Sequence, residues 1–477
     1  MATISTAFNI ATGALNADQA ALNIVANNTA NANTPGYTVE SPNWTENDSV
    51  SLGGVSYGLG ATLTGAESQR NLVLEHAMQQ QTQAESGTAA RLTALDQMQA
   101  LFSGATSPDS STSVASGIGS DLSNLFDALQ SLEGNPSDGS LRQSVLDTAG
   151  TLASDFNGAA AQLASQQQSL DEQSTSVVGQ ANTLLSNIAQ LNVQIESKSP
   201  ESDAGTLEDQ RQQDLTELSQ LVGINTIQAA DNGLTVTTTG GALLVSDGQA
   251  YAITNGEDDG VTHFYDSQGN DITADLTAGG GQLGGILMAR DQDIPQVERS
   301  LDTLAYGVAS TMNQLNEGGA DVNGNAGTAI FSLPAMATAA DPSGSAAEIA
   351  VTMTDPSGIA AAASGNGPGD DTNLLLMANP DEYTTGLGTT PTSCFSNMVT
   401  QLGSLTSEIS TENTAQQAAL TQLQNQIGTL SGVNLNDEAA SLETLEQSYQ
   451  AASKLFTVLD QVMLSALNLG VDTSYSS

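Results

Sequence analysis

The residues that could act in catalysis or bind a metal are few and far apart in this sequence. His76 and His263 are its only histidines, and Cys394 is its only cysteine. A zinc site or a serine, histidine and aspartate triad needs several such side chains brought together, and neither histidine has a second histidine or a cysteine nearby. The sequence therefore predicts no catalytic residue, no metal site and no cofactor.

One acidic stretch has part of the pattern of a calcium-binding loop. Asp321-Val-Asn-Gly-Asn325 resembles the start of such a loop, in which carboxylates and amides alternate. The loop needs glycine at its sixth place and a bidentate glutamate at its twelfth, where this chain has Ala326 and Ser332. We expect this stretch to form a turn.

Composition excludes several classes of function. The 477 residues include 8 Lys plus Arg against 53 Asp plus Glu, a formal net charge of -45. Nucleic acids and anionic membranes would repel such a surface, so neither is an expected partner. No apolar run reaches the 18 residues of a membrane-spanning helix, and the first basic residue is Arg70, which excludes a cleavable signal peptide at this end. A lone cysteine allows no intrachain disulfide.

The elements that must position any functional surface are helices, and the last one is the most regular. From Ala440 to Leu469 the apolar residues recur at alternating steps of three and four, which places them in one seam of a helix, as in a coiled coil. Asn436 is the expected N-cap, with acidic residues in the first turn. The seam residues that we single out are Leu445, Tyr449, Phe456, Leu459 and Met463.

The expected partner of this helix lies at the other end of the chain. In the stretch Ile4 to Asn31, Phe8, Leu15 and Leu22 recur every seven residues and are flanked by alanines, which permit close helix approach. We predict that the two terminal helices pair as a coiled coil. The alternative is two ordinary amphipathic helices that each pack on a domain core.

Between the ends, long helical patterns enclose one β-rich segment. Helices are predicted over 66–102, 118–132, 140–197, 206–221, 283–315 and 395–430, while 223–282 contains short β-branched runs separated by Gly and Asp. The fold class is therefore mainly α with an inserted small β domain, an elongated helical bundle and nested domains. The predicted domains are residues 1–33 with 436–477 (terminal coiled coil), 34–222 with 283–435 (helical bundle) and 223–282 (β-rich).

The turn after the first helix resembles a known signature. An Asn-rich run leads into Pro35 and Gly36, and its pattern resembles the N-terminal motif shared by axial proteins of the bacterial flagellum, which include rod, hook and hook-associated subunits. The residues that carry the motif are Ala26, Asn27, Asn28, Asn31, Thr34, Gly36 and Tyr37.

Further stretches narrow this resemblance to the family of first hook-associated proteins. They lie before, inside and after the β-rich segment and near the C-terminus. They are Leu207 to Gly223, Gly240 to Val245, Gly281 to Asp291, Ser431 to Ala440 and Tyr449 to Ser453.

The resemblance implies a structural subunit at the junction between hook and filament, secreted to the extracellular flagellum. It implies export through the type III channel without cleavage and polymerisation through the terminal helices. The implied partners are other copies of the chain in a ring, the hook protein, a second junction protein and an export chaperone on the C-terminal helix. Alternatives are another axial subunit (hook protein or flagellin), a secreted adhesin or a secreted enzyme on a helical scaffold.

Overall fold

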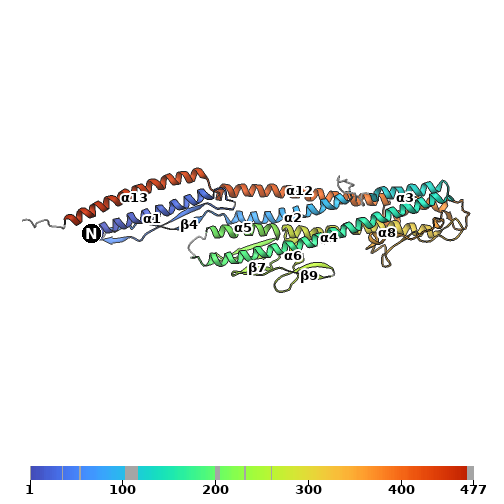
Figure 1. The fold of residues 1–477 in the computed structure, drawn as a ribbon, viewed down its shortest axis with the longest axis horizontal. Helices are drawn as coiled ribbons and strands as arrows, with labels where there is room; N and C mark the ends of the chain where they lie inside the picture. Colours follow the sequence, from blue (N-terminus) through green and yellow to red (C-terminus); the bar gives the residue numbers. More distant parts are fainter. Residues whose placement is uncertain are drawn as a thin grey trace, which may run out of the picture.

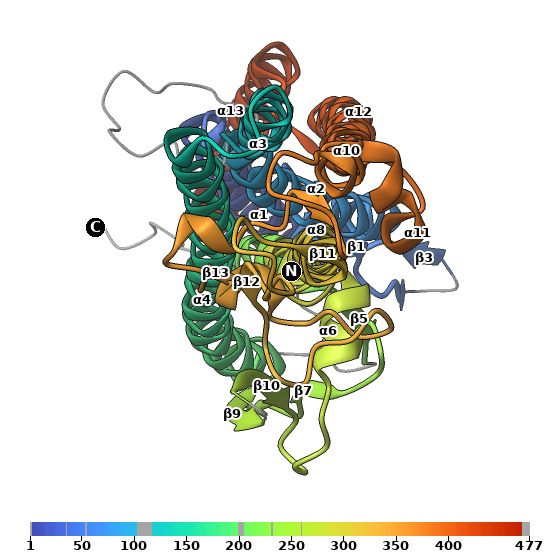
Figure 2. The same cartoon turned by 90° about the vertical axis from the view of Figure 1, so that its right-hand side faces the viewer.

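The computed structural model describes residues 2–34, 36–52, 55–102, 117–198, 205–229, 232–258 and 260–469. The molecule is elongated, with two long helices at one end and a helical bundle over the rest of its length (Figure 1). Seen along the long axis, α4 lies on one flank, α12 and α13 on another, and the β-rich segment on a third (Figure 2).

The two terminal helices lie side by side at one end of the molecule (Figure 1). Helix α1 is Ala2–Asn31 and helix α13 is Leu435–Leu469. They run antiparallel, since Phe8 meets Phe456 while Asn28 meets Glu438. The expected N-cap at Asn436 is wrong by two residues. The Asn434 side chain instead accepts from the Asn436 N–H (3.1 Å), and the helix begins at Leu435.

A long β-hairpin follows α1 and packs along it. Strands β1 and β4 pair antiparallel, with a register shift between Asn43 and Trp44. A side chain at Gly60, just before β4, would start 3.3 Å from Ile10, so the hairpin touches the helix closely. The strands are β1 (Glu40–Glu46), β2 (Val50–Leu52), β3 (Val55–Tyr57) and β4 (Ala61–Ser68).

The structure corrects the predicted start of the next helix. We expected helix from residue 66, but residues up to Ser68 belong to β4, and helix α2 is Leu72–Phe102. The helix starts late because the Asn71 side chain accepts from the Leu74 N–H (3.2 Å), which satisfies a donor of the first turn.

The bundle has a continuous apolar core in which helices separated in sequence pack together. Helix α12 lies along α2, and α4 contacts α3, α5 and α8 (Figure 1). Leu95, Leu122, Phe156 and Leu301, from four different helices, are fully buried. The bundle helices are α2, α3 (Ile118–Glu133), α4 (Gly139–Glu196), α5 (Thr206–Leu221), α7 (Gly281–Met288), α8 (Ile294–Gly318) and α12 (Pro391–Ser431).

One predicted helix is interrupted. The stretch 283–315 was expected to be continuous, but a π-helical segment, Ala289–Asp293, separates α7 from α8. This wider turn holds the buried Arg290, whose guanidinium reaches Asp171 (2.5 Å) and Asp291 (2.7 Å). Arg91 of α2 pairs with Asp293 through two bonds of 2.8 Å. The π turn therefore positions two ion pairs that hold α2, α4 and α8 together.

The inserted β-rich segment packs on the C-terminal half of α4. Its four-stranded antiparallel sheet has the order β5-β6-β7-β8, and β9 and β10 form a separate hairpin. Asn182 and Asn192 of α4 donate to the carbonyls of Ile253 (2.8 Å) and Leu234 (2.7 Å). The elements are β5 (Ile224–Gln228), β6 (Leu234–Thr238), β7 (Leu243–Ser246), β8 (Gln249–Ala250), β9 (Thr254–Asp258), β10 (Val261–Tyr265) and α6 (Thr273–Gly279).

The end of the bundle remote from the terminal helices carries short elements. Buried Arg142 donates to the carbonyl of Pro136 (2.7 Å) and to that of Ile359 (2.6 Å), so it joins this region to the α3–α4 turn. The elements are β11 (Gly319–Ala320), β12 (Phe331–Ser332), α9 (Ser345–Glu348), β13 (Ala350–Val351), η3 (Pro356–Gly358), β14 (Ala362–Ala363), α10 (Thr372–Met377), η4 (Pro380–Tyr383) and α11 (Thr384–Leu387).

The predicted fold class is confirmed: the chain is mainly α, with a small inserted β segment and paired terminal helices. The three domain boundaries stay a prediction. No helix in the described ranges combines the length and the apolar character that crossing a membrane requires.

Candidate assembly interface

The contact between the terminal helices includes an aromatic pair. The rings of Phe8 on α1 and Phe456 on α13 have centroids 4.5 Å apart and are tilted by 41°. Aromatic pairs at this separation contribute about 0.5–1.5 kcal/mol beyond the area they bury. This contact brings together two predicted seam residues that lie at opposite ends of the sequence.

The remaining predicted seam residues are only partly covered. Leu15 and Leu22 on α1 and Leu445 and Leu459 on α13 are half-buried. Tyr449 and Met463 keep 39% and 38% of their surface exposed. The fully buried apolar residues of α1 are smaller neighbours, namely Ala11, Ala17, Ala21 and Val25. The two helices alone therefore leave their seam incompletely buried.

Helix α13 also carries a second apolar stripe, which the sequence analysis missed. Leu455, Val458 and Val462 recur at steps of three and four, and they keep 49%, 54% and 46% of their surface exposed. We call these three residues the outer stripe. Val458 and Val462, with Gln461, Ser465 and Ala466, also line a shallow groove. The spacing of these residues is visible in the sequence, beside the seam that was predicted.

The Asn-rich motif connects the terminal helices to the rest of the molecule. Asn28 is buried, and its amide donates to the Glu40 carbonyl (2.8 Å) and to the Glu438 carboxylate (3.1 Å). Its side-chain oxygen accepts from the Glu40 N–H (3.0 Å) and from the Tyr37 hydroxyl (2.8 Å). One side chain thus connects α1, the start of β1 and the first turn of α13.

Burial and the neighbouring carboxylates Glu40, Asp209 and Glu438 raise the pKa of Tyr37. Its hydroxyl therefore stays protonated and continues to donate to Asn28.

The other motif residues shape the turn without entering this network. The Asn31 amide donates to the Asn27 side chain (2.8 Å), and the Thr34 hydroxyl donates to Asn31 (3.2 Å). Gly36 has φ +78°, a left-handed conformation that costs glycine least. Ala26 and Asn27 are exposed. Pro35 lies outside the described residues.

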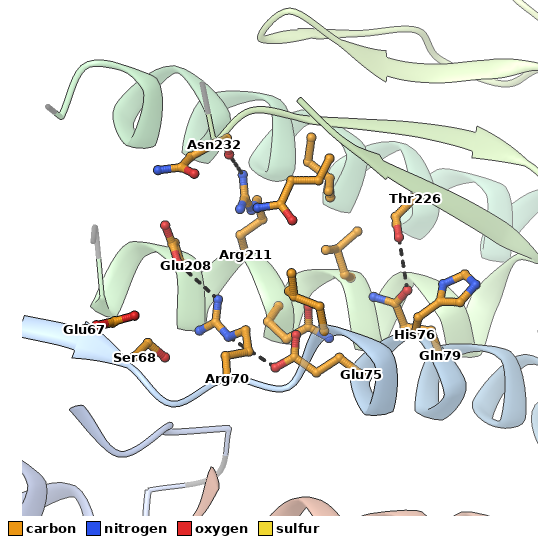
Figure 3. A pocket seen from close by; sticks show the side chains of 15 residues that line it. Glu67, Ser68, Arg70, Glu75, His76, Gln79, Glu208, Arg211, Thr226 and Asn232 are labelled. Atoms are coloured by element: carbon orange, nitrogen blue, oxygen red, sulfur yellow. Dashed lines mark hydrogen bonds and ion pairs between the residues drawn. The ribbon is translucent and has the colours of Figure 1, made fainter. Parts of the chain in front are cut away.

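A cleft of about 540 Å³ lies beside this motif, between the ends of α2 and α5. Figure 3 shows Arg70 between Glu75 of α2 and Glu208 of α5. The Arg70 guanidinium is 3.1 Å from Glu75 and 3.4 Å from Glu208, and it also pairs with Asp209. Arg211, further along α5, donates to Asn192 (2.9 Å) and to the Asn232 carbonyl (2.7 Å). Arg70 is thus paired with three carboxylates and Arg211 with two amide oxygens, an arrangement that holds the surrounding elements together.

The groups considered for chemistry stay apart. His76 bonds to Gln80 (3.1 Å) and His263 to Asp271 (2.7 Å). The Asp321 carboxylate accepts from the N–H groups of Asn323 and Asn325 (2.8 Å each), as expected for a turn. Within the described ranges, no three His, Cys, Asp or Glu side chains gather as metal ligands.

Comparison with known proteins identifies the family. The family described as "Flagellar hook-associated protein FlgK helical domain" matches residues 95–331, and "Flagella basal body rod protein" matches residues 8–38, which include the Asn-rich motif. Flagellar hook-associated protein 1 of Escherichia coli (strain K12) is 25% identical, over 98% of this chain and 100% of that protein. The Bacillus subtilis (strain 168) protein of the same name is 25% identical, over 95% of this chain and 96% of its own length.

The chain belongs to the FlgK-type family of flagellar hook-associated proteins.

A solved structure of that type has the same fold. The flagellar hook junction protein FlgK from Burkholderia pseudomallei superposes with a TM-score of 0.66 at 18% sequence identity, and it covers 75% of this chain and all of that chain. The family consists of structural flagellar proteins rather than enzymes. The chain is accordingly a component of the axial structure of the extracellular flagellum, which confirms the predicted location.

Proposed function

We propose that this chain forms the junction between hook and filament and is incorporated there through its terminal helices. The observation that carries the proposal is the unfinished burial of α13. Its seam meets α1 at Phe8 and Phe456, while the three residues of the outer stripe keep about half of their surface exposed. Contiguous exposed apolar surface on a soluble protein marks an interaction site.

Neighbouring copies of the chain are the proposed occupants of the outer stripe. A helix that lies beside α1 on one face and exposes a second apolar face can pack against another terminal pair. Head-to-tail contacts of this kind use two different surfaces and close into a ring when the rotation fits. Phe8, Leu15, Leu22, Leu445, Tyr449, Phe456, Leu459 and Met463 would hold each pair together.

The other partners follow from the family. We propose that the ring contacts the hook protein on one side and a second junction protein on the other. We propose export through the flagellar type III channel without cleavage, with α13 bound to a chaperone beforehand. A chaperone groove could cover the same apolar face that neighbouring copies later bury. The turn at Gly36 would set the angle between the terminal helices and the bundle.

The proposal is tested by one charge on the outer stripe. Val458→Glu should leave the bundle folded, because Val458 is half exposed on a helix outside it. In the assembled ring the same carboxylate would be buried without a partner, at a cost of several kcal/mol. In a strain that lacks this gene, we expect the variant to be exported and to give hooks without filaments in electron micrographs, with loss of swimming.

Gln450→Glu is the matched control, since it adds the same charge to an exposed polar position of α13 away from the stripe. It should support normal filaments. Leu459→Glu tests the seam in the same way. Wild-type motility from both Val458→Glu and Leu459→Glu would show that α13 is not the assembly element.

A further inference from the structure

Arg70 lies where the bundle meets the segments that lead to the terminal helices. It lies in the short link between β4 and α2, and its buried guanidinium pairs with Glu75, Glu208 and Asp209. All four side chains keep 15% or less of their surface exposed. One base therefore holds the first turn of α2 and the first turn of α5 together (Figure 3).

The same cluster is bonded to the connecting strands. Asp209 accepts from the Thr38 N–H at 3.4 Å. The next residue, Val39, donates to the Ser431 carbonyl and accepts from the Gln69 N–H, both at 2.9 Å, so the strands that enter and leave the hairpin meet the end of α12. We call this set, together with the neighbouring Arg211, the joint: Thr38, Val39, Gln69, Arg70, Glu75, Glu208, Asp209, Arg211 and Ser431.

The charges of the joint do not balance when every group is ionised. Glu75 faces Arg70 from the link, Glu208, Asp209 and Arg211 from α5, and the neighbouring His76 on its own helix. Glu67 lies on the exposed rim of the cleft, and Glu40 and Glu438 approach from the side of the terminal helices. Three buried carboxylates against two guanidinium groups leave one negative charge, and one proton removes it.

We propose that the joint closes with a proton on Glu75 and opens when that proton leaves, so that pH sets how firmly the terminal helices are held to the bundle. In the closed joint, Glu75 is neutral and Arg70 balances Glu208 and Asp209 together with Arg211. In the open joint, Glu75 is ionised and hydrated, and α2 and α5 no longer share Arg70. This device goes beyond the proposed assembly role and belongs to the single chain.

The direction follows from proton linkage. Burial raises the pKa of Glu75 from 4.5 to about 7, although Arg70 opposes the shift, and burial also raises the pKa of Asp209. A raised pKa means that the closed joint binds the proton more tightly than the open joint does. The ratio of open to closed molecules therefore rises about tenfold per pH unit between about pH 4.5 and 7, and it levels off above pH 7.

Pulsed electron spin resonance between two spin labels measures the joint directly. In a Cys394→Ser background, Ala61→Cys and Gln220→Cys place labels at exposed positions of the hairpin and of α5, on either side of the joint. We expect one narrow distance distribution at pH 5.5 and a second, broad component at pH 8.5, where the open-to-closed ratio should be about 30-fold above that at pH 5.5.

Glu75→Gln keeps the shape of the protonated side chain and should give the narrow distribution at both pH values. Glu67→Gln, which removes an exposed carboxylate from the rim of the same cleft, is the matched control and should behave as wild type. A wild-type distribution that does not change with pH, or a Glu75→Gln variant that still opens at pH 8.5, would overturn the proposal. Since the labels report on the free chain, failure here leaves the assembly proposal standing, and failure of assembly leaves this result intact.

Discussion

The bundle and the terminal helices bury their apolar residues to different degrees, although both are built from the same helical periodicity. Phe156 of α4 and Leu301 of α8 are fully buried within the chain. Leu455 and Val458 of α13 keep about half of their surface exposed. The bundle is thus complete as one molecule, whereas the terminal pair has apolar surface left for a partner. Periodicity alone predicts a helix and its apolar face, but not whether the same chain covers that face.

The largest expected effect is the difference in stability between removing an aromatic ring from the bundle and removing one from the terminal pair. Phe156→Ala removes a fully buried side chain and should lower the free energy of unfolding of the bundle by about 3–5 kcal/mol. Phe456→Ala removes a partly buried ring and should change the bundle transition little, while it loosens the terminal pair. Urea denaturation followed by circular dichroism measures both. If Phe456→Ala cost as much as Phe156→Ala, the terminal helices would belong to the same cooperative core.

A smaller effect is expected at Asn28, where the terminal pair does have a buried polar contact. Asn28→Ala leaves the Glu40 N–H and the Tyr37 hydroxyl without their acceptor, at about 1–3 kcal/mol for a buried unsatisfied group. Hydrogen exchange of peptides from the C-terminal end of α1 should accelerate about tenfold or more, while peptides from α4 stay unchanged. Asn27→Ala, one residue away and exposed, is the control and should exchange nearly as wild type. Equal acceleration in both variants would contradict a specific role for Asn28.

The bundle should also respond to pH through one carboxyl pair. Burial and the adjacent Asp121 carboxylate raise the pKa of Asp155 from 3.8 to about 7. The folded chain thus binds this proton more tightly than the unfolded chain. The resulting stability is fully present below about pH 4, and is lost as pH rises towards 7. The urea midpoint of wild type should fall between pH 5 and pH 8, and Asp155→Asn should reduce that fall.

Asp127→Asn, an exposed substitution on α3, controls for the general loss of negative charge and should leave the fall intact. The same pH dependence in Asp155→Asn and wild type would show that the pair does not titrate in this range.

The smallest effect should be that of salt on the contact between copies. The described terminal helices carry one base, Lys454, and the acids Asp18, Asp437, Glu438, Glu443, Glu446 and Asp460. Since like charges repel and salt screens exposed charges, association of isolated chains should strengthen a few-fold between about 50 and 200 mM NaCl. Sedimentation velocity measures this association. Weaker association at higher salt would mean that the contact is an attraction between opposite charges.

Much of the fold could be predicted from sequence, because the spacing of apolar residues indicates long helices, and turn-forming residues indicate where they end. Helix α5 has the predicted bounds, α3 ends one residue later than predicted, and α4 both begins and ends one residue earlier. The failures are local. The π-helical segment at 289–293 differs from an α-helix in its backbone hydrogen bonds, which the apolar spacing of the sequence does not reveal. Strand β4 extended past residue 66 because pairing with β1, a distant contact, outweighs local helix propensity.

The interface was predicted less completely. Phe8 and Phe456 follow from the seam pattern, and the structure brings them together. The role of Asn28 was not predictable in detail, because its partner Glu438 lies 410 residues away in the sequence. The ion pairs of Arg70 could not be predicted for the same reason, since its carboxylate partners come from two helices far apart in the chain. Whether Leu15, Leu22, Tyr449, Leu459 and Met463 form the assembly contact stays a prediction.

The start of α1 and the end of α13 lie at the same extremity of the molecule (Figure 1). If adjoining subunits pack on the terminal helices as proposed, a bulky fusion beside the start of α1 would compete with them for that surface and should block polymerisation. The β9–β10 hairpin lies on a different flank of the molecule from α13, so an epitope placed there should leave the outer stripe free.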